Sequence, residues 1–121
     1  MTKTNSEIMT IKQKALAHFK SKLAGELLNI KVDEWDCNIY YRATSSMAVE
    51  SKIVKLTTEG RTAEALIESI IQKAMDVDGK RLFHDTDRAS LMNEVDPSVL
   101  IKVAGALNHA NADTIGDIEK N

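Results

Sequence analysis

The segment from about Arg61 to Met75 places apolar residues at clean helical spacing, and an Asp-Gly turn signal follows it directly. The apolar positions recur every three or four residues. They are Ala63, Leu66, Ile67, Ile70, Ile71 and Ala74. A helix with such a face is stable in a small protein mainly because other elements cover that face. The segment therefore predicts a helix that contributes one side to a packed core.

Four further segments show helical spacing or helix start signals. Their approximate ranges are 7–24, 45–56, 85–92 and 97–109. We expect Ser6 to cap the first helix and Gly25 to end it, and Ser45 or Ser46 to cap the second. Asp96-Pro97 is a strong start signal for the last helix, because Asp can cap a helix and proline fits its first position.

Two short stretches between the first and second helices have the alternation typical of strands. Leu28, Ile30 and Val32 alternate with polar residues, Asp33–Asp36 can form a turn, and 37–43 is the expected return strand, with Ile39 and Tyr41 on one face. Two strands alone are marginally stable in water, so the hairpin must pack against helices or pair with another subunit. The expected fold is α+β and mainly helical: an N-terminal helix, a small hairpin and a cluster of about four helices.

Length and charge limit the organisation and the partners. With 121 residues we expect one α+β domain over 1–110 and a mobile polar tail over 111–121. A net charge of -2 argues against a protein built on phosphate contacts. A helix-turn-helix is also disfavoured, because Asp87 and Glu94 would repel phosphate. No apolar run is long enough to span a bilayer, and the first residues lack an apolar signal core. We expect a soluble, cytoplasmic protein that binds neither nucleic acid nor membrane.

The residue types that carry catalysis are scattered. His18, His84 and His109 have no metal-ligand spacing with another candidate. The single Cys37 excludes an internal disulfide and fits a reducing compartment. It lies in a strand pattern where a half-buried structural thiol is the usual outcome, although a Cys37–His84 dyad stays open as an alternative. We expect no enzyme, no catalytic residue, no cofactor and no metal.

The stretch from Ala74 to Asp87 contains four carboxylates around a glycine, and one alternative interpretation is a calcium loop. Placing Gly79 at the sixth position of an EF-hand loop puts Asp76 third and Asp78 fifth, as such a loop requires. It also puts Ala74 first, where a methyl group cannot bind a cation, and Asp85 twelfth, where Glu is required. The spacing therefore disfavours a calcium-responsive regulator.

A structural corner explains the same stretch better. Asp-Gly adopts the positive φ of a tight turn, and Asp85 is the expected cap of the next helix. Leu82 and Phe83 are expected to point back to the core. We assign a structural role to Asp76, Asp78, Gly79, Leu82 and Phe83.

The order of several short motifs resembles that of one viral family. The motifs are Trp35 after Asp33-Glu34, Ile39-Tyr40-Tyr41-Arg42, Asp76-Val77-Asp78-Gly79-Lys80-Arg81-Leu82-Phe83 with Asp87, and Leu107-Asn108. In this order they resemble the tail assembly chaperones of long-tailed bacteriophages, and the resemblance spans about 30–108. The family often has a Gly-x-Lys-Ser-like stretch before the last helix. In this chain residues 93–98 occupy that position and differ from the Gly-x-Lys-Ser-like stretch. The resemblance therefore does not identify the subfamily or the exact partner.

The resemblance implies a non-enzymatic protein that binds the tape measure protein, keeps it soluble and helps to recruit tail tube subunits. It further implies action in the host cytoplasm and absence from the mature virion, and a homo-oligomer is possible. The candidate partner-binding residues are Trp35, Tyr40, Arg42, Phe19 and Leu23. The alternatives are a structural tail component or generic protein-interaction module and, less favoured, the calcium-responsive regulator.

Overall fold

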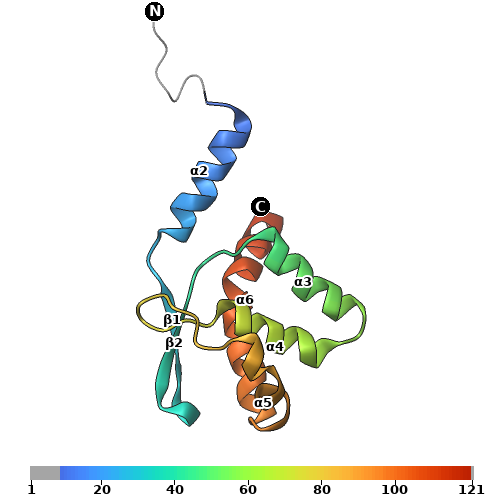
Figure 1. Ribbon diagram of the computed structural model, residues 1–121. Coiled ribbons are helices and arrows are strands. Elements are labelled where there is room, and N and C mark those ends of the chain that lie inside the picture. The colour runs from blue at the N-terminus through green and yellow to red at the C-terminus, as the bar shows by residue number, and fades with distance from the viewer. Residues whose placement is uncertain (1–8, 121) are drawn as a thin grey trace, which may run out of the picture.

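A helical cluster and a small hairpin form the fold, with one further helix standing to the side (Figure 1). The computed structural model describes residues 9–120, with side chains as far as Asn108. The helices and strands are α2 (Ile11–Leu23), β1 (Leu28–Val32), β2 (Cys37–Tyr41), α3 (Met47–Thr58), α4 (Thr62–Lys73), α5 (Arg88–Asn93) and α6 (Pro97–Lys120). Two short 3-10 turns precede β2 and α5, at Asp33–Trp35 and Asp85–Asp87. The expected α+β fold is confirmed.

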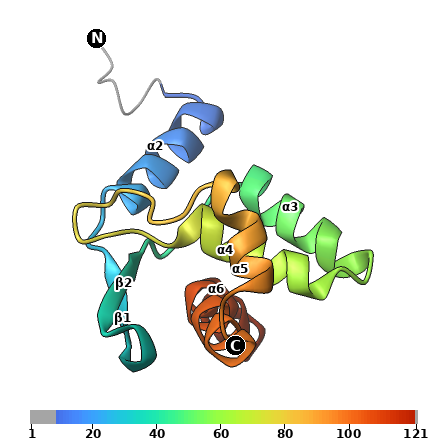
Figure 2. The same ribbon diagram turned by 60° about the horizontal axis from the view of Figure 1, so that its bottom comes forward.

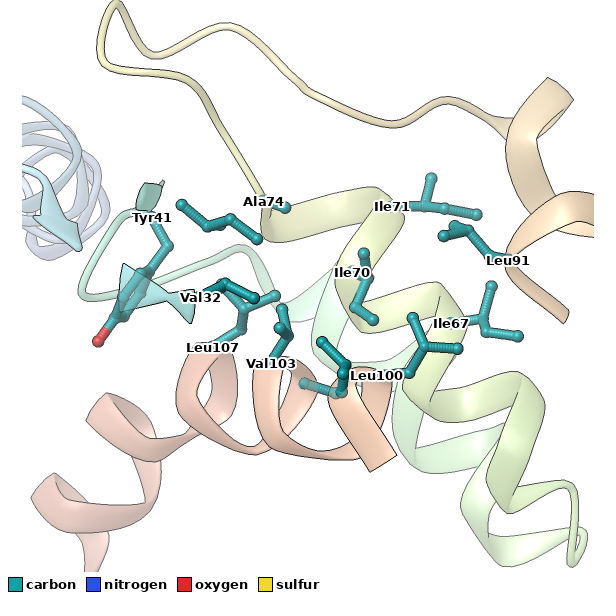
Figure 3. Close-up of a cluster of buried hydrophobic side chains, with 13 residues drawn as sticks. Val32, Tyr41, Ile67, Ile70, Ile71, Ala74, Leu91, Leu100, Val103 and Leu107 are labelled. Atoms are coloured by element: carbon teal, nitrogen blue, oxygen red, sulfur yellow. The ribbon is translucent and has the colours of Figure 1, made fainter. Parts of the chain in front are cut away.

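Helix α4 lies at the centre of the fold and packs against α3, α5 and α6. Its buried apolar residues face the hairpin, α5 and α6 (Figure 3). The buried core consists of Val32, Ile39, Tyr41, Ile67, Ile70, Ile71, Ala74, Leu91, Val99, Leu100, Val103, Ala104 and Leu107. Most of the predicted apolar face is confirmed, but Ala63 is exposed and Leu66 only half-buried, while Ala65 is buried. The periodicity is right, but the buried side is rotated because α4 has neighbours on several sides.

The hairpin is antiparallel, with Ile30 opposite Ile39 and Val32 opposite Cys37. Val32 and Ile39 are buried, whereas Leu28, at the open end of the ladder, is exposed. β1 contacts α6, so the hairpin packs against a helix of its own chain. This is one of the two arrangements expected from the sequence. One residue on the outer edge of β2 is also paired, because the backbone of Tyr40 exchanges hydrogen bonds of 2.9 and 2.7 Å with that of Met75.

The expected corner after α4 is a tight turn held by one carboxylate. Gly79 has a φ of 81°, and the Asp76 carboxylate accepts backbone N–H bonds from Asp78 at 2.9 Å and Lys80 at 3.0 Å. The Arg81 guanidinium then donates two bonds to the carbonyl of Ile71, at 3.0 and 2.8 Å. The turn thus returns the chain to the end of α4 and satisfies a carbonyl that the helix leaves open.

Two predictions for the following residues are wrong. Leu82 is 40% exposed, because the chain passes over the surface at this point. The Asp85 carboxylate binds Arg88 instead of capping a helix. The Asp87 carboxylate accepts the N–H of His84 at 2.8 Å at the start of the 3-10 turn, and α5 itself has no side-chain cap bond. Phe83 does turn inward, and its ring packs edge-on against Trp35 with centroids 6.5 Å apart.

The helix ends agree in part with the sequence. Ser46 caps α3, and Asp96 accepts the N–H of Ser98 at 3.0 Å just where α6 begins. α6 continues to Lys120, so the predicted helix end near His109 is wrong, and the mobility of 111–121 stays a prediction. α2 begins at Ile11, with Thr10 as its cap. The expected cap Ser6 lies outside the described residues.

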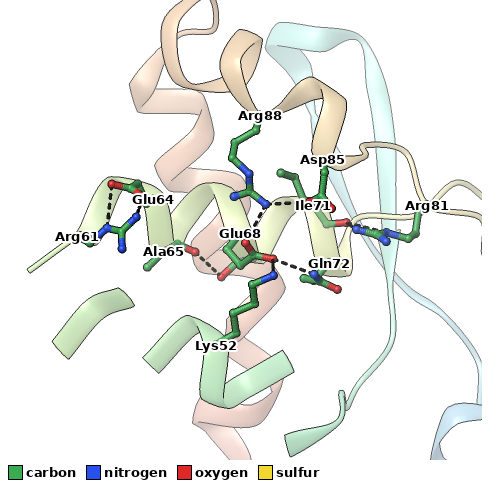
Figure 4. Close-up of polar contacts among 11 residues, drawn as sticks. Lys52, Arg61, Glu64, Ala65, Glu68, Ile71, Gln72, Arg81, Asp85 and Arg88 are labelled. Carbon is green, nitrogen blue, oxygen red and sulfur yellow. Dashed lines mark hydrogen bonds and ion pairs between the residues drawn. The ribbon is translucent and has the colours of Figure 1, made fainter. Parts of the chain in front are cut away.

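Two charged side chains of α4 are buried with the apolar ones. Glu68 is 1% exposed; it receives bonds from Arg88 at 2.9 Å and Gln72 at 2.8 Å, and Lys52 lies 3.5 Å away (Figure 4). Lys73 lies further along the same helix. It pairs with Glu50 at 2.8 Å and donates to the Asn108 side chain at 2.6 Å. These pairs join α4 to α3, α5 and α6.

Two carboxylates at these contacts, Glu68 and the half-buried Glu50, are stabilised in their charged form. Burial alone would raise the pKa of Glu68, but the hydrogen bonds from Gln72 and Arg88 outweigh it and lower that pKa. Burial likewise opposes the hydrogen bonds from Lys73 and Ser45 at Glu50, and the net effect again lowers the pKa. A carboxylate with a lowered folded-state pKa stabilises the fold above its unfolded pKa, and this contribution is lost as the pH falls through the folded pKa.

We therefore expect Glu68→Gln to lower the free energy of unfolding by about 1.5–3 kcal/mol at neutral pH, since it removes charge-assisted bonds from a buried site. The variant should also lose less stability than the wild type when the pH falls below the ordinary Glu range. Urea denaturation at several pH values measures both effects. Glu64→Gln, which breaks an exposed pair with Arg61 on the same helix, is the control and should change stability much less. Equal losses for both variants would contradict the assignment.

The turn generates a second prediction. A Cβ on Gly79 would combine a positive φ with a 3.3 Å approach to Nη2 of Arg42. Gly79→Ala should therefore lower the free energy of unfolding by about 1–2 kcal/mol. Gly105 of α6 has open space around it, so Gly105→Ala should raise it by up to about 1 kcal/mol. Denaturation curves of the two variants test the opposite signs, and a neutral Gly79→Ala would show that the turn imposes no strain.

Candidate functional site

Three of the five predicted partner-binding residues lie in one region. Phe19 and Leu23 are one turn apart on α2, and both are half-buried. The Arg42 guanidinium, just after β2, donates through Nη1 to the carbonyl of Leu23 and so connects the end of α2 with the end of the hairpin. Trp35 lies instead at the tip of the hairpin against Phe83, and Tyr40 pairs with Met75. The roles of all five in binding stay predictions.

A cavity of about 170 Å³ opens beside this connection. Its lining combines three apolar side chains with charged and polar ones from the β2–α3 loop and α4. The residues are Leu23, Arg42, Thr44, Ser45, Gln72, Lys73, Met75 and Leu107. Sequence reasoning assigned only Leu23 and Arg42 of these to a binding site, because the others come from segments far apart along the chain. We call this space the α2 cavity.

The charges in the α2 cavity are not equally balanced. Lys73 is compensated by Glu50, which also accepts a bond from Ser45. Among the side chains that the structure describes, no carboxylate lies within ion-pair distance of Arg42, whose bond goes to a neutral carbonyl. The cavity therefore has a cationic side where an acidic group could bind.

Helix α2 extends the same surface away from the domain. None of its residues is buried, and Ile11 and Leu16 are 87% and 59% exposed. Figures 1 and 2 both show the helix projecting from the hairpin and away from the helical cluster. Five of its apolar residues lie along one side of the helix, together with two of its lysines, and we call these five the α2 stripe: Ile11, Ala15, Leu16, Phe19 and Leu23. Such an uncovered stripe is typical of a protein-binding surface.

A second apolar surface lies between α4, α5 and α6. It is a groove of about 190 Å³, lined by Ala63, Leu66, Ile67, Leu91, Met92, Val95, Pro97, Leu100 and Ile101. Met92 and Ile101 are 41% and 57% exposed. Both residues are apolar and directly follow a buried leucine on their helix. This pattern is the sequence signal that could have predicted the α4–α6 groove.

The described residues provide no group of three His, Cys, Asp or Glu side chains arranged to hold a metal ion. The Asp76 carboxylate, which a calcium loop would need as a ligand, is bonded to the backbone of its own turn. Cys37 is exposed, so the expected half-buried thiol is wrong; the residue ends the ladder beside the hairpin turn. Of the helices that the structure describes, none has the length and apolar character to cross a membrane.

Comparison with known proteins gives a likeness in structure. Neither a protein-family model nor a curated protein matches the sequence. Among solved structures, the chain is similar to the tail assembly chaperone of bacteriophage HK97, with a TM-score of 0.55 and 20% sequence identity. The match covers 80% of this chain and 95% of the HK97 protein. The resemblance noted in the motif order is thus confirmed in three dimensions: the chain has the fold of a phage tail assembly chaperone.

Proposed function

We propose that this protein is a tail assembly chaperone of a long-tailed bacteriophage, which binds the tape measure protein, keeps it soluble and helps to recruit tail tube subunits. The observation that carries the proposal is the likeness to the HK97 chaperone over 95% of that protein's length. Fold alone does not define function. The motif order from Trp35 to Asn108, found independently in the sequence, supports the same assignment.

The surface of the molecule supports a protein that acts by binding. The uncovered α2 stripe and the α4–α6 groove are both apolar and exposed, and such surfaces fit a helical client. A long helical client with exposed apolar faces would aggregate unless these faces were covered. We further propose that the protein acts in the host cytoplasm and is left behind when the tail is complete.

Co-expression tests this function. We expect the tape measure protein encoded in the same genome to be soluble to a several-fold greater extent when this chain is present, and to copurify with it. A small acidic protein of unrelated fold is the control for expression load. A tape measure protein that stays insoluble and does not copurify would contradict the proposal.

Mass spectrometry of purified virions separates the chaperone from a structural tail component. The chaperone should be absent from finished particles while it is abundant in infected-cell lysate. Its recovery from virions in stoichiometric amounts would show a structural tail protein instead.

A further inference from the structure

We propose that the α2 stripe and the α2 cavity form one continuous docking site for an amphipathic helix with acidic flanks. The inference rests on the proposed function for one premise, namely that the helix belongs to the tape measure protein. The chemistry of the occupant follows from the exposure, continuity and charge of the surface.

The first argument is that none of the described residues buries the apolar face of α2: Phe19 and Leu23 are half-buried, and the other residues of the stripe are exposed. The helix has 13 residues and no buried side chain, and an isolated helix of this length is marginal in water. Its start is nevertheless well formed, because Thr10 and Gln13 exchange cap bonds of 2.8 and 3.1 Å. A capped helix with an uncovered stripe gains its main stabilisation when a partner packs on that stripe.

The second argument is that the stripe leads into the cavity. Leu23 is the last residue of the stripe and also lines the cavity, together with Met75 and Leu107. The bond from Arg42 to the Leu23 carbonyl holds this end of α2 against the domain. A helix packed along the stripe would therefore place one end over the cavity. A flat membrane surface would leave that cavity unfilled.

The third argument is the charge of α2. The helix carries four lysines and no acidic residue: Lys12, Lys14, Lys20 and Lys22. In the part of the chain with described side chains, none of these lysines has an ion-pair partner. Arg42 adds a further cation at the cavity end. Packing of α2 against α2 of a second copy would bring like charges together, whereas acidic flanks would be attracted.

Two synthetic helical peptides test the chemistry directly. They share one leucine stripe and differ only in flanking residues, Glu in one and Lys in the other. Fluorescence anisotropy with the full chain should give a dissociation constant about tenfold lower for the Glu peptide at low ionic strength, and high salt should reduce the ratio. Equal affinities, a preference for the Lys peptide or no binding of either would overturn the proposal.

Surface variants locate the binding site. Ile11→Ser combined with Leu16→Ser changes two exposed side chains of the stripe and should weaken Glu-peptide binding about tenfold or more. Val54→Ser is the matched control, because it changes a similarly exposed apolar residue of α3, outside both apolar surfaces, and should leave binding unchanged. Circular dichroism of all variants verifies the fold. A loss with Val54→Ser and none with the stripe variant would overturn the proposal.

Tape measure fragments separate this proposal from the proposed function. If the wild type binds the Glu peptide through α2 but no tape measure fragment, the docking site stands and the assigned client is wrong. If the wild type binds a fragment and the stripe variant binds it equally, the docking site is wrong and the function stands.

Sedimentation without client provides the last check. Dissociation of an oligomer by the stripe variant would identify a second copy as the occupant and overturn the proposal. Binding to phosphatidylglycerol vesicles that depends on α2, without peptide binding, would overturn it as well.

Discussion

Burial of α4 is the interaction on which the rest of the structure depends. Ile67, Ile70 and Ile71 are nearly inaccessible, and each such side chain contributes about 1.5–3 kcal/mol through removal from water. α3, α5, α6 and the hairpin are all arranged around this helix (Figure 3). α5, α6 and the hairpin supply the other buried apolar residues of this core, whereas α3 and α2 supply none.

The polar contacts of α4 then determine which neighbour lies where. Glu68 binds partners from α3 and α5, and Lys73 binds partners from α3 and α6. A buried charge without its partner would be strongly unfavourable, so these pairs disfavour other arrangements of the same apolar helices. At the end of α4, Met75 and Arg81 connect the helix to β2 and to the tight turn. The hairpin, the turn and the α2 cavity are positioned through these contacts.

Much of the fold could be predicted because its signals are local. Helical spacing indicated α3, α4 and α6, alternation indicated the hairpin, and Asp96-Pro97 and Gly79 marked a helix start and a turn. The wrong predictions concern residues whose burial or hydrogen-bond partner depends on segments far away in the sequence. Ala65 is buried in place of Ala63, Leu82 is exposed, and the Asp85 carboxylate binds Arg88 instead of capping a helix. Periodicity predicts which side of a helix is apolar, but it does not predict which residues at the borders of that side are buried by other elements.

The candidate site divides in the same way. The sequence by itself determined the apolar stripe and the lysines of α2, since both follow from residue order on a helix of known period. Only the tertiary structure decided that this stripe stays uncovered and that Arg42 joins it to a cavity. Those facts depend on contacts between residues far apart in the chain, such as Arg42 with Leu23 and Lys73 with Asn108. Long-range contacts follow from how all elements share one small core, and no local pattern contains that information.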